Sequence, residues 1–511
     1  MRRAFYFPGM FILTLLAGAG TIPAAVSCDK LAALSLPHAT VTMAARVEAG
    51  SFVPPPVPWE TRPPDPAPFR NLPAFCRVAA TLTPSRDSMI HIEVWLPVDG
   101  WNGKFMGVGN GGWAGSISYG SLAGALRRGY AAASTDTGHQ GAGQDGSWIQ
   151  GHPEKLVDYG YRAVHEMTVK AKAVVEACYG RMPRYSYWSG CSNGGRQALK
   201  EAQQFPADYD GIIAGAPANS WSRLMASQLW IALAVHRDEA AYIPPKKYAR
   251  IHKAALEACD AQDGIRDGVL DDPTRCRFDP KELECKSVEA DDCLTAAQVE
   301  AARKIYAPLK NPRTGEVIFP GLEPGSELGW AGLAGPVPFP LPKDYFGQAV
   351  LGKAGWDWKT FDFDRDLARA LRADPGKINA DHPDLRPFAG RGGKLLIYFG
   401  WNDQLIPPRD IIRYYESAVQ KLGGAAKASG SVRLFMVPGT NHCGGGDGPC
   451  KFDMVGPLEQ WVEQRQAPDR IIGSHETGGV TDRTRPLCPY PLAARYKGTG
   501  STDDAANFEC K

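Results

Sequence analysis

The sequence lacks an excess of charge of either sign, because 57 Lys and Arg residues face 55 Asp and Glu residues in a chain of 511. A nucleic-acid partner, which requires a basic surface, is therefore not expected. The chain also lacks CxxC pairs and HxxxH spacings, so zinc ligation is not expected. No apolar run reaches the roughly 20 residues that a membrane-spanning helix needs, so we expect no stable membrane association. Thirteen Trp, nineteen Phe and eighteen Tyr instead predict a folded globular protein.

The N-terminus has the layout of a secretory signal peptide. Arg2 and Arg3 precede an apolar run over residues 10–17, and small residues follow through Ala25. We expect cleavage near residue 27, so that residues 1–27 are removed and the mature protein is secreted or periplasmic. A twin-arginine signal and a lipid anchor on Cys28 are minor alternatives.

The twelve cysteines agree with an oxidising destination, and their even number predicts a disulfide framework. The short separations from Cys259 to Cys276 and from Cys285 to Cys293 suggest two small bridged loops. Parity alone leaves the pairing of the other cysteines open.

Four junctions between a strand and a turn predict an α/β core, at residues 105–112, 185–195, 395–403 and 432–442. The stretch 220–385 lacks the alternation of strand and helix that a parallel sheet needs. We therefore expect residues 28–219 and 386–511 to form the core and residues 220–385 to form an inserted lid domain. A Pro-rich segment over residues 50–75 is expected to run extended over the surface.

The second junction contains a candidate nucleophile. Residues 184–190 predict a strand, and the residues that follow predict a tight turn into a helix; Gly190, Ser192 and Gly194 fill the pattern GxSxG. A strained turn of this kind projects a serine hydroxyl above the sheet and leaves backbone N–H groups free to bind an oxyanion. A Gly-rich turn with a structural serine is the alternative interpretation.

A nucleophilic serine needs an orienting carboxylate and a histidine base, which follow it in that order in this fold. Two late strands are expected, over residues 394–400 and 432–437. Asp403 follows the first of them, and His442 lies in a Gly-rich loop after the second. A turn cap and a surface loop residue are the alternative interpretations of these two residues. Asp410 and Asp447 are weaker candidates for the acid.

The oxyanion hole takes one backbone N–H from the residue after the nucleophile, which is Asn193, and one from an early loop. The Gly-rich loop at residues 109–115 follows an early strand, and we expect Gly111 to supply the second N–H because glycine lets the backbone approach a substrate closely. No GKS or GKT follows these glycines, so a phosphate site is not expected.

Together these motifs resemble the tannase and feruloyl esterase family of secreted α/β-hydrolases. The mark of that family is one cysteine beside the nucleophile and another beside the histidine, which Cys191 and Cys443 match. The resemblance covers nearly the whole mature chain and implies an α/β-hydrolase core with a lid. It also implies five disulfides, with Cys178 and Cys450 left over: Cys28–Cys76, Cys191–Cys443, Cys259–Cys276, Cys285–Cys293 and Cys488–Cys510.

An acidic loop over residues 259–271 offers oxygen ligands for a hard cation, although its spacing is not that of an EF-hand. A solvated acidic turn is the alternative. The resemblance implies that this loop is a structural Ca²⁺ site in the lid. Its implied ligands are the side chains of Asp260, Asp263 and Asp267 and the backbone carbonyls of Ile265 and Val269.

The activity that the resemblance implies is hydrolysis of esters of aromatic acids, above all feruloyl and other hydroxycinnamoyl esters, free or linked to plant polysaccharides. Gallate esters and a terephthalate mono-ester are alternatives, although no arginine is identified that would bind a free carboxylate. A peptidase or lipase on the same fold and a non-catalytic binding protein are the rival classes. Seven lid aromatics are candidates to stack on the acyl group: Trp330, Tyr345, Phe346, Trp356, Trp358, Phe361 and Phe363.

Overall fold

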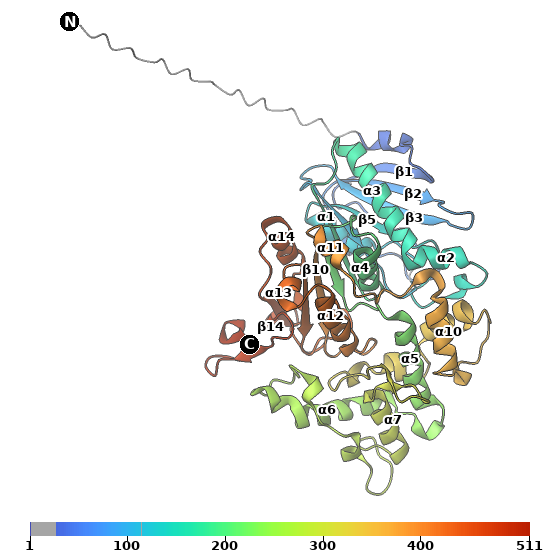
Figure 1. Cartoon of the computed structure of the whole chain (residues 1–511), viewed down its shortest axis with the longest axis vertical. Helices are drawn as coiled ribbons and strands as arrows, with labels where there is room; N and C mark the ends of the chain where they lie inside the picture. Colours follow the sequence, from blue (N-terminus) through green and yellow to red (C-terminus); the bar gives the residue numbers. More distant parts are fainter. Residues whose placement is uncertain (2–26, 114) are drawn as a thin grey trace.

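A nine-stranded sheet forms the centre of the computed structural model, which describes residues 1, 27–113 and 115–511 (Figure 1). The predicted signal peptide therefore lies almost wholly outside the described residues. The strand order is β1-β2-β3-β5-β4-β6-β7-β10-β11. These strands are β1 (Ala39–Val47), β2 (Phe75–Leu82), β3 (Ile90–Pro97), β4 (Lys104–Val108), β5 (Ala131–Thr135), β6 (Tyr185–Cys191), β7 (Gly211–Gly215), β10 (Lys394–Gly400) and β11 (Val432–Val437).

The strands from β5 to β11 in this order run parallel, whereas β1, β2 and β3 form an antiparallel extension at one side. Parallel neighbours require crossover connections, which helices supply here. The carboxyl ends of the parallel strands therefore meet at one edge of the sheet, where α/β proteins bind their ligands. This topology confirms the predicted α/β class.

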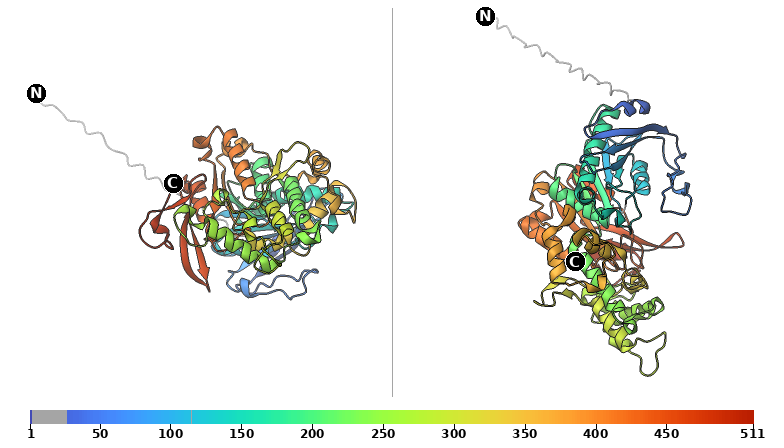
Figure 2. Two further views of the ribbon diagram at one scale, coloured as in Figure 1. Left: turned by 90° about the horizontal axis from the view of Figure 1, so that it is seen from below. Right: turned by 90° about the vertical axis from the view of Figure 1, so that its right-hand side faces the viewer.

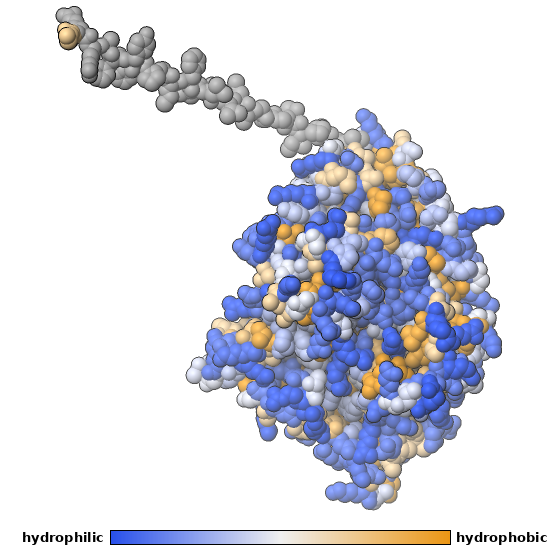
Figure 3. All heavy atoms as spheres, viewed as in Figure 1, coloured by the Kyte–Doolittle hydropathy of each residue, from blue (hydrophilic) through white to orange (hydrophobic). Residues whose placement is uncertain are grey.

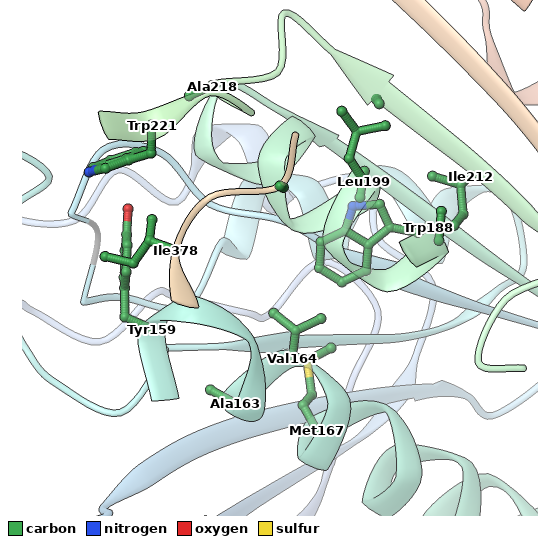
Figure 4. Packing of buried hydrophobic residues seen from close by; sticks show 14 of the residues in the cluster. Tyr159, Ala163, Val164, Met167, Trp188, Leu199, Ile212, Ala218, Trp221 and Ile378 are labelled. Carbon is green, nitrogen blue, oxygen red and sulfur yellow. The ribbon is translucent and has the colours of Figure 1, made fainter. Parts of the chain in front are cut away.

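Helices cover both faces of the sheet, because parallel strands are buried on both sides. The alternation of side chains sends Ile212 and Ile213 of β7 into two different hydrophobic clusters. Figure 4 shows the first cluster, in which Val164 lies near Trp188 and Leu199. Helices α3 (Ala163–Tyr179), α4 (Asn193–Gln204) and α12 (Arg409–Lys421) contribute to this cluster, and α1 (Tyr119–Arg127) and α14 (Val455–Gln464) contribute to the other.

Between β7 and β10 the chain, all of it described, adds no strand to the nine-stranded sheet. Helices α6 (Tyr248–Cys259) and α7 (Ala296–Tyr306) of this segment lie at the end of the molecule opposite β1 (Figures 1 and 2). The other α-helices of the segment are α5 (Trp221–His236), α8 (Ala331–Ala334), α9 (Pro340–Asp344), α10 (Arg365–Ala373) and α11 (Arg386–Gly390), and the segment also forms a small sheet of β8 (Leu309–Lys310) and β9 (Val317–Phe319). The lid boundaries at residues 220 and 385 stay predictions.

The C-terminal region adds small sheets that sequence analysis did not identify. One is β12 (Lys451–Phe452), β13 (Ile471–Thr477) and β14 (Val480–Leu487), and the other is β15 (Ala494–Tyr496) with β16 (Phe508–Cys510). At the other end, the Pro-rich segment is largely extended but contains a 3₁₀ turn at Ala67–Phe69 and a turn at residues 57–60, and Phe52, Phe69 and Leu72 anchor it in the core. Two short helices, α2 (Pro153–Val157) and α13 (Ala425–Ala428), complete the set of α-helices in the described residues.

All five implied disulfides are present in the structure, and Cys178 and Cys450 are free. Hydrophilic residues dominate the face drawn in Figure 3, with hydrophobic residues confined to small patches. In the described part of the chain, none of the helices combines the length and the apolar character required to cross a bilayer.

Candidate active site

The predicted site residues follow the carboxyl ends of four parallel strands. Gly111 follows β4, Ser192 follows β6, Asp403 follows β10 and His442 follows β11. Because these ends share one edge of the sheet, residues separated by hundreds of positions in sequence are brought to one place.

Ser192 occupies the sharp turn between β6 and α4, with φ of 63° and ψ of −120°. A positive φ is strained for a residue other than glycine, and such strain is common at functional turns. The turn is possible because two glycines let the backbone pass closely. A Cβ on Gly190 would lie 2.6 Å from the carbonyl oxygen of Gly194, and a Cβ on Gly195 would lie 2.2 Å from that of Gly215.

Arg196, one turn into α4, is fully buried and holds the residue that follows the nucleophile. Its Nε donates to Oδ1 of Asn193 at 2.7 Å, and its Nη atoms donate to the carbonyls of Gly160 at 2.7 Å and Tyr159 at 3.0 Å. A planar guanidinium can satisfy these diverging acceptors together. Sequence analysis assigned no role to Arg196, because its partners lie about 35 residues earlier in the chain.

His442 and Asp403 form a hydrogen-bonded pair. Nδ1 of His442 lies 2.7 Å from Oδ2 of Asp403, which is fully buried. The second oxygen, Oδ1, accepts the backbone N–H groups of Leu405 and Ile406, each at 2.9 Å. These bonds satisfy the buried carboxylate and fix its direction. The two weaker acid candidates lie elsewhere: Asp410 pairs with Arg413 at 2.8 Å, and Asp447 lies 4.0 Å from His252.

A disulfide joins the loop of the serine to the loop of the histidine. Cys191 precedes Ser192, Cys443 follows His442, and their Cα atoms are 5.9 Å apart. This bond fixes the distance between two turns that come from different strands.

A cavity of about 390 Å³ opens beside these residues. Ser192, His442 and both predicted oxyanion residues, Gly111 and Asn193, line it. The other lining side chains are mostly apolar, and include Trp221, Leu224, Met225, Phe339, Leu341, Leu405 and Ile406.

The structure corrects the expectation for the acyl site, because none of the seven aromatic residues expected to stack on the acyl group lines this cavity. Trp330, Tyr345 and Phe346 are fully buried in the cores that the helices form.

The predicted Ca²⁺ loop follows α6 and is closed by the Cys259–Cys276 disulfide. Its three aspartates accept backbone N–H groups of the loop itself: Asp260 from Gly268 at 3.1 Å, Asp263 from Ile265 at 3.0 Å and Asp267 from Val269 at 3.2 Å. Side chains that curl back on their own backbone in this way leave the remaining lone pairs of their carboxylates available to a cation.

The negative charges of this loop repel one another. Burial, together with the charge of Asp263, raises the pKa of the nearby Asp271 to about 7. Arg485, from β14, pairs with Asp267. This one arginine offsets part of the negative charge, and oxygen donors that still repel one another fit a hard cation. The oxygen atoms of the three loop aspartates do not all lie within 4.8 Å of one another. Among the described residues, the one group of His, Cys, Asp and Glu side chains that meets this distance is His165, Glu201 and Asp208.

Comparisons with known proteins agree with this geometry. The family model described as tannase and feruloyl esterase matches residues 76–338 and 347–511. An uncharacterized esterase of Xanthomonas campestris is 41% identical over 96% of this chain and 92% of its own length. A probable feruloyl esterase B-2 of Aspergillus terreus is 33% identical over 85% of this chain and 86% of its own. The crystal structure of feruloyl esterase B from Aspergillus oryzae superposes with a TM-score of 0.86 at 30% identity, covering 95% of this chain and 99% of that one. The chain therefore belongs to the tannase and feruloyl esterase family and is a carboxylic ester hydrolase.

Proposed function

We propose that Ser192, His442 and Asp403 form a catalytic triad that hydrolyses feruloyl and related hydroxycinnamoyl esters through an acyl-enzyme. One observation supports this most directly: a serine in a strained turn lines the same cavity as a histidine that is paired with a buried carboxylate. A structural serine would have no need of either feature.

The proposed reaction follows from the direction of the His442–Asp403 bond. With the Nδ1 proton donated to Asp403, Nε2 of His442 is free to take the proton of Ser192 as Oγ attacks the ester carbonyl. The N–H groups of Asn193 and Gly111 would donate to the oxyanion of the tetrahedral intermediate. The imidazolium then returns the proton to the departing alcohol. Water attacks the acyl-enzyme by the same route and releases the acid.

The lining of the cavity supports an aromatic acyl group. Trp221 and Phe339 offer ring surfaces, and Leu224 and Met225 add apolar area. No Lys or Arg of the described residues lines the cavity, which disfavours a terephthalate mono-ester with its free carboxylate. Relatives named as feruloyl esterases are consistent with the choice of a feruloyl ester.

Two further parts of the proposal concern the setting of the enzyme. A structural Ca²⁺ held by Asp260, Asp263 and Asp267 and by the carbonyls of Ile265 and Val269 would supply positive charge to the acidic loop, and take no part in the chemistry at Ser192. Residues 1–27 would direct the enzyme to the periplasm or the exterior and would then be removed. Five disulfides are typical of proteins in such oxidising compartments.

The test compares wild type, Ser192→Ala and the control Ser189→Ala on methyl ferulate, methyl gallate, p-nitrophenyl butyrate and casein. We expect wild type and control to prefer methyl ferulate, and Ser192→Ala to lose all activity while melting at the same temperature. Activity retained in Ser192→Ala would overturn the mechanism. A preference for casein or the butyrate would favour a peptidase or lipase, and no activity on any substrate would favour a binding protein.

A further inference from the structure

Three side chains that commonly bind metals meet near the C-terminal end of α4, whose N-terminal end lines the cavity. His165 lies in the first turn of α3, Glu201 near the end of α4, and Asp208 in the loop before β7. One ligand atom of each lies within 4.8 Å of the other two. Glu201 is eight residues along α4 from Asn193, about 12 Å at the rise of a helix, so this cluster is separate from the proposed triad.

The carboxyl group of Glu201 lies against that of Asp208, and no N–H or hydroxyl group of the described residues donates to it. Its side chain is 1% exposed, and both carboxylate oxygens are buried without a donor. Buried polar atoms without a donor are rare and costly, and a bound ion is one way to satisfy them. Burial, the neighbouring charge of Asp208 and a hydrogen bond between the two carboxyl groups raise the pKa of Glu201 well above its usual range.

One cation already lies beside the cluster. The ammonium of Lys172 donates to the backbone carbonyl of Asp208, and its charge opposes the rise in the pKa of Glu201. A cation bound between the carboxyl groups would favour the ionised form of Glu201 in the same way. His165 lies with Nδ1 2.7 Å from Oδ2 of Asp208, and its ring stacks on Phe205 with centroids 3.9 Å apart.

We infer that His165, Glu201 and Asp208 bind a divalent transition-metal ion of the zinc class. One imidazole nitrogen with two carboxylates is a ligand set that Zn²⁺ favours, and it matches neither a purely oxygen-liganded Ca²⁺ site nor a thiolate site. Ligands around a tetrahedral zinc are about 3.4 Å apart, so atoms already within 4.8 Å need only small movements. His165 and Asp208 are partly exposed, which leaves room for water as the fourth ligand.

The ion would fasten together three elements that the chain brings from separate places. It would link the start of α3, the end of the helix that carries the proposed nucleophile, and the entry to β7. Its expected effect is therefore on stability. Sequence analysis did not identify this site, because its ligands come from three separate segments, at residues 165, 201 and 208, and form no HxxxH or CxxC pattern.

The experiment measures zinc bound to the whole protein. Wild type is kept in millimolar calcium, so that the acidic loop is saturated, then mixed with zinc sulfate and passed through gel filtration before elemental analysis. We expect about one zinc per chain and a higher melting temperature with zinc than without. Glu201→Gln, which keeps the shape of the side chain, and His165→Phe, which keeps the stack on Phe205, should both lose the bound zinc and the rise in melting temperature.

His152→Phe is the matched control, because His152 also lies against a carboxylate, Asp87, at 3.1 Å, but in a pair with no third ligand. It should retain the zinc. Wild type that retains no zinc, or variants that retain as much as wild type, would overturn the inference, and Glu201 and Asp208 would then share a proton. If Glu201→Gln does not fold, the zinc content of His165→Phe is the test, since the side chain of His165 is partly exposed and its replacement disturbs the core less.

Discussion

Cys191 and Cys443 are bonded to each other although they stand 252 residues apart, and each is the direct neighbour of a proposed catalytic residue. The serine turn and the histidine loop are thus held by a covalent bond in addition to the packing of their strands. The predictions below begin with this bond.

Replacing both cysteines, in Cys191→Ser/Cys443→Ser, should lower kcat at least tenfold, because the Ser192–His442 distance is then held only by loop packing. Unfolding should also become easier by about 2–5 kcal/mol, as is typical when a native disulfide is removed. Ester hydrolysis and urea unfolding measure the two effects. Cys285→Ser/Cys293→Ser, which opens a lid bridge with a separation of only eight residues, should keep kcat unchanged. Equal kcat in both double variants would contradict a positioning role for the first bond.

Asp403→Asn should reduce kcat by about 10³–10⁴, because an amide no longer fixes the tautomer of His442 or stabilises its charged form. The melting temperature should change little, since the amide oxygen can still accept the two backbone N–H groups of Leu405 and Ile406. Asp447→Asn, at the rejected acid candidate, serves as control and should retain full activity. A loss shared by both variants would remove the basis for assigning Asp403.

Phe339→Ala should lower kcat/KM for methyl ferulate by about 10- to 100-fold, as expected when a ring loses about 1.5–3 kcal/mol of apolar contact. Methyl acetate, which does not reach across the cavity, should be affected much less. Trp358→Ala tests the earlier expectation for the lid aromatics and should leave both substrates unaffected, because Trp358 does not line the cavity. The measurement is the ratio of kcat/KM for methyl ferulate to kcat/KM for methyl acetate in each variant.

The contribution of the buried His139 to the free energy of unfolding should be lost as the pH drops from about 6.5 to about 4. His139 is buried, its ring stacks on Trp148 at 3.8 Å, and burial lowers its pKa to about 4. The unfolded chain binds a proton in this window while the folded chain does not, so protonation favours unfolding by up to about 3 kcal/mol. Urea unfolding at several pH values should show a shallower acid slope in His139→Gln than in wild type. The exposed His382→Gln should keep the wild-type slope.

Calcium should raise the melting temperature of protein that has been freed of metal by a chelator and dialysis. At a concentration a hundred times its Kd, the ion would add about 2.7 kcal/mol. Asp263→Asn should lose most of this gain, whereas Asp357→Asn, an exposed helix cap in the lid, should keep it. A gain of equal size in Asp263→Asn would move the calcium site away from this loop.

The elements that carry the site could be predicted from local sequence. The strands expected over residues 394–400 and 432–437 coincide with β10 and β11, because each is an apolar run ended by Gly or Pro. The turn at Ser192 could also be predicted, since the close backbone contact that requires Gly190 is with Gly194, only four residues later. The assignment of Ser192 as the nucleophile stays a prediction.

Features that depend on distant contacts could not be predicted. Arg196 gains its importance from carbonyls of an earlier segment, and Phe339 reaches the cavity only through the packing of the lid. Trp330 is an aromatic residue of the same segment as Phe339, but its ring packs against Tyr248 and Tyr306 in the core. Sequence patterns do not distinguish an aromatic that lines a cavity from one that fills a core.

The pairing of Asp267 with Arg485 has a consequence for the order in which the protein is made. These partners lie 218 residues apart, and Arg485 follows every residue of the proposed triad in the sequence. During synthesis, the acidic loop is therefore made long before this partner. A chain that stops before residue 485 has an acidic loop without this ion pair, even when every residue of the proposed triad is already present.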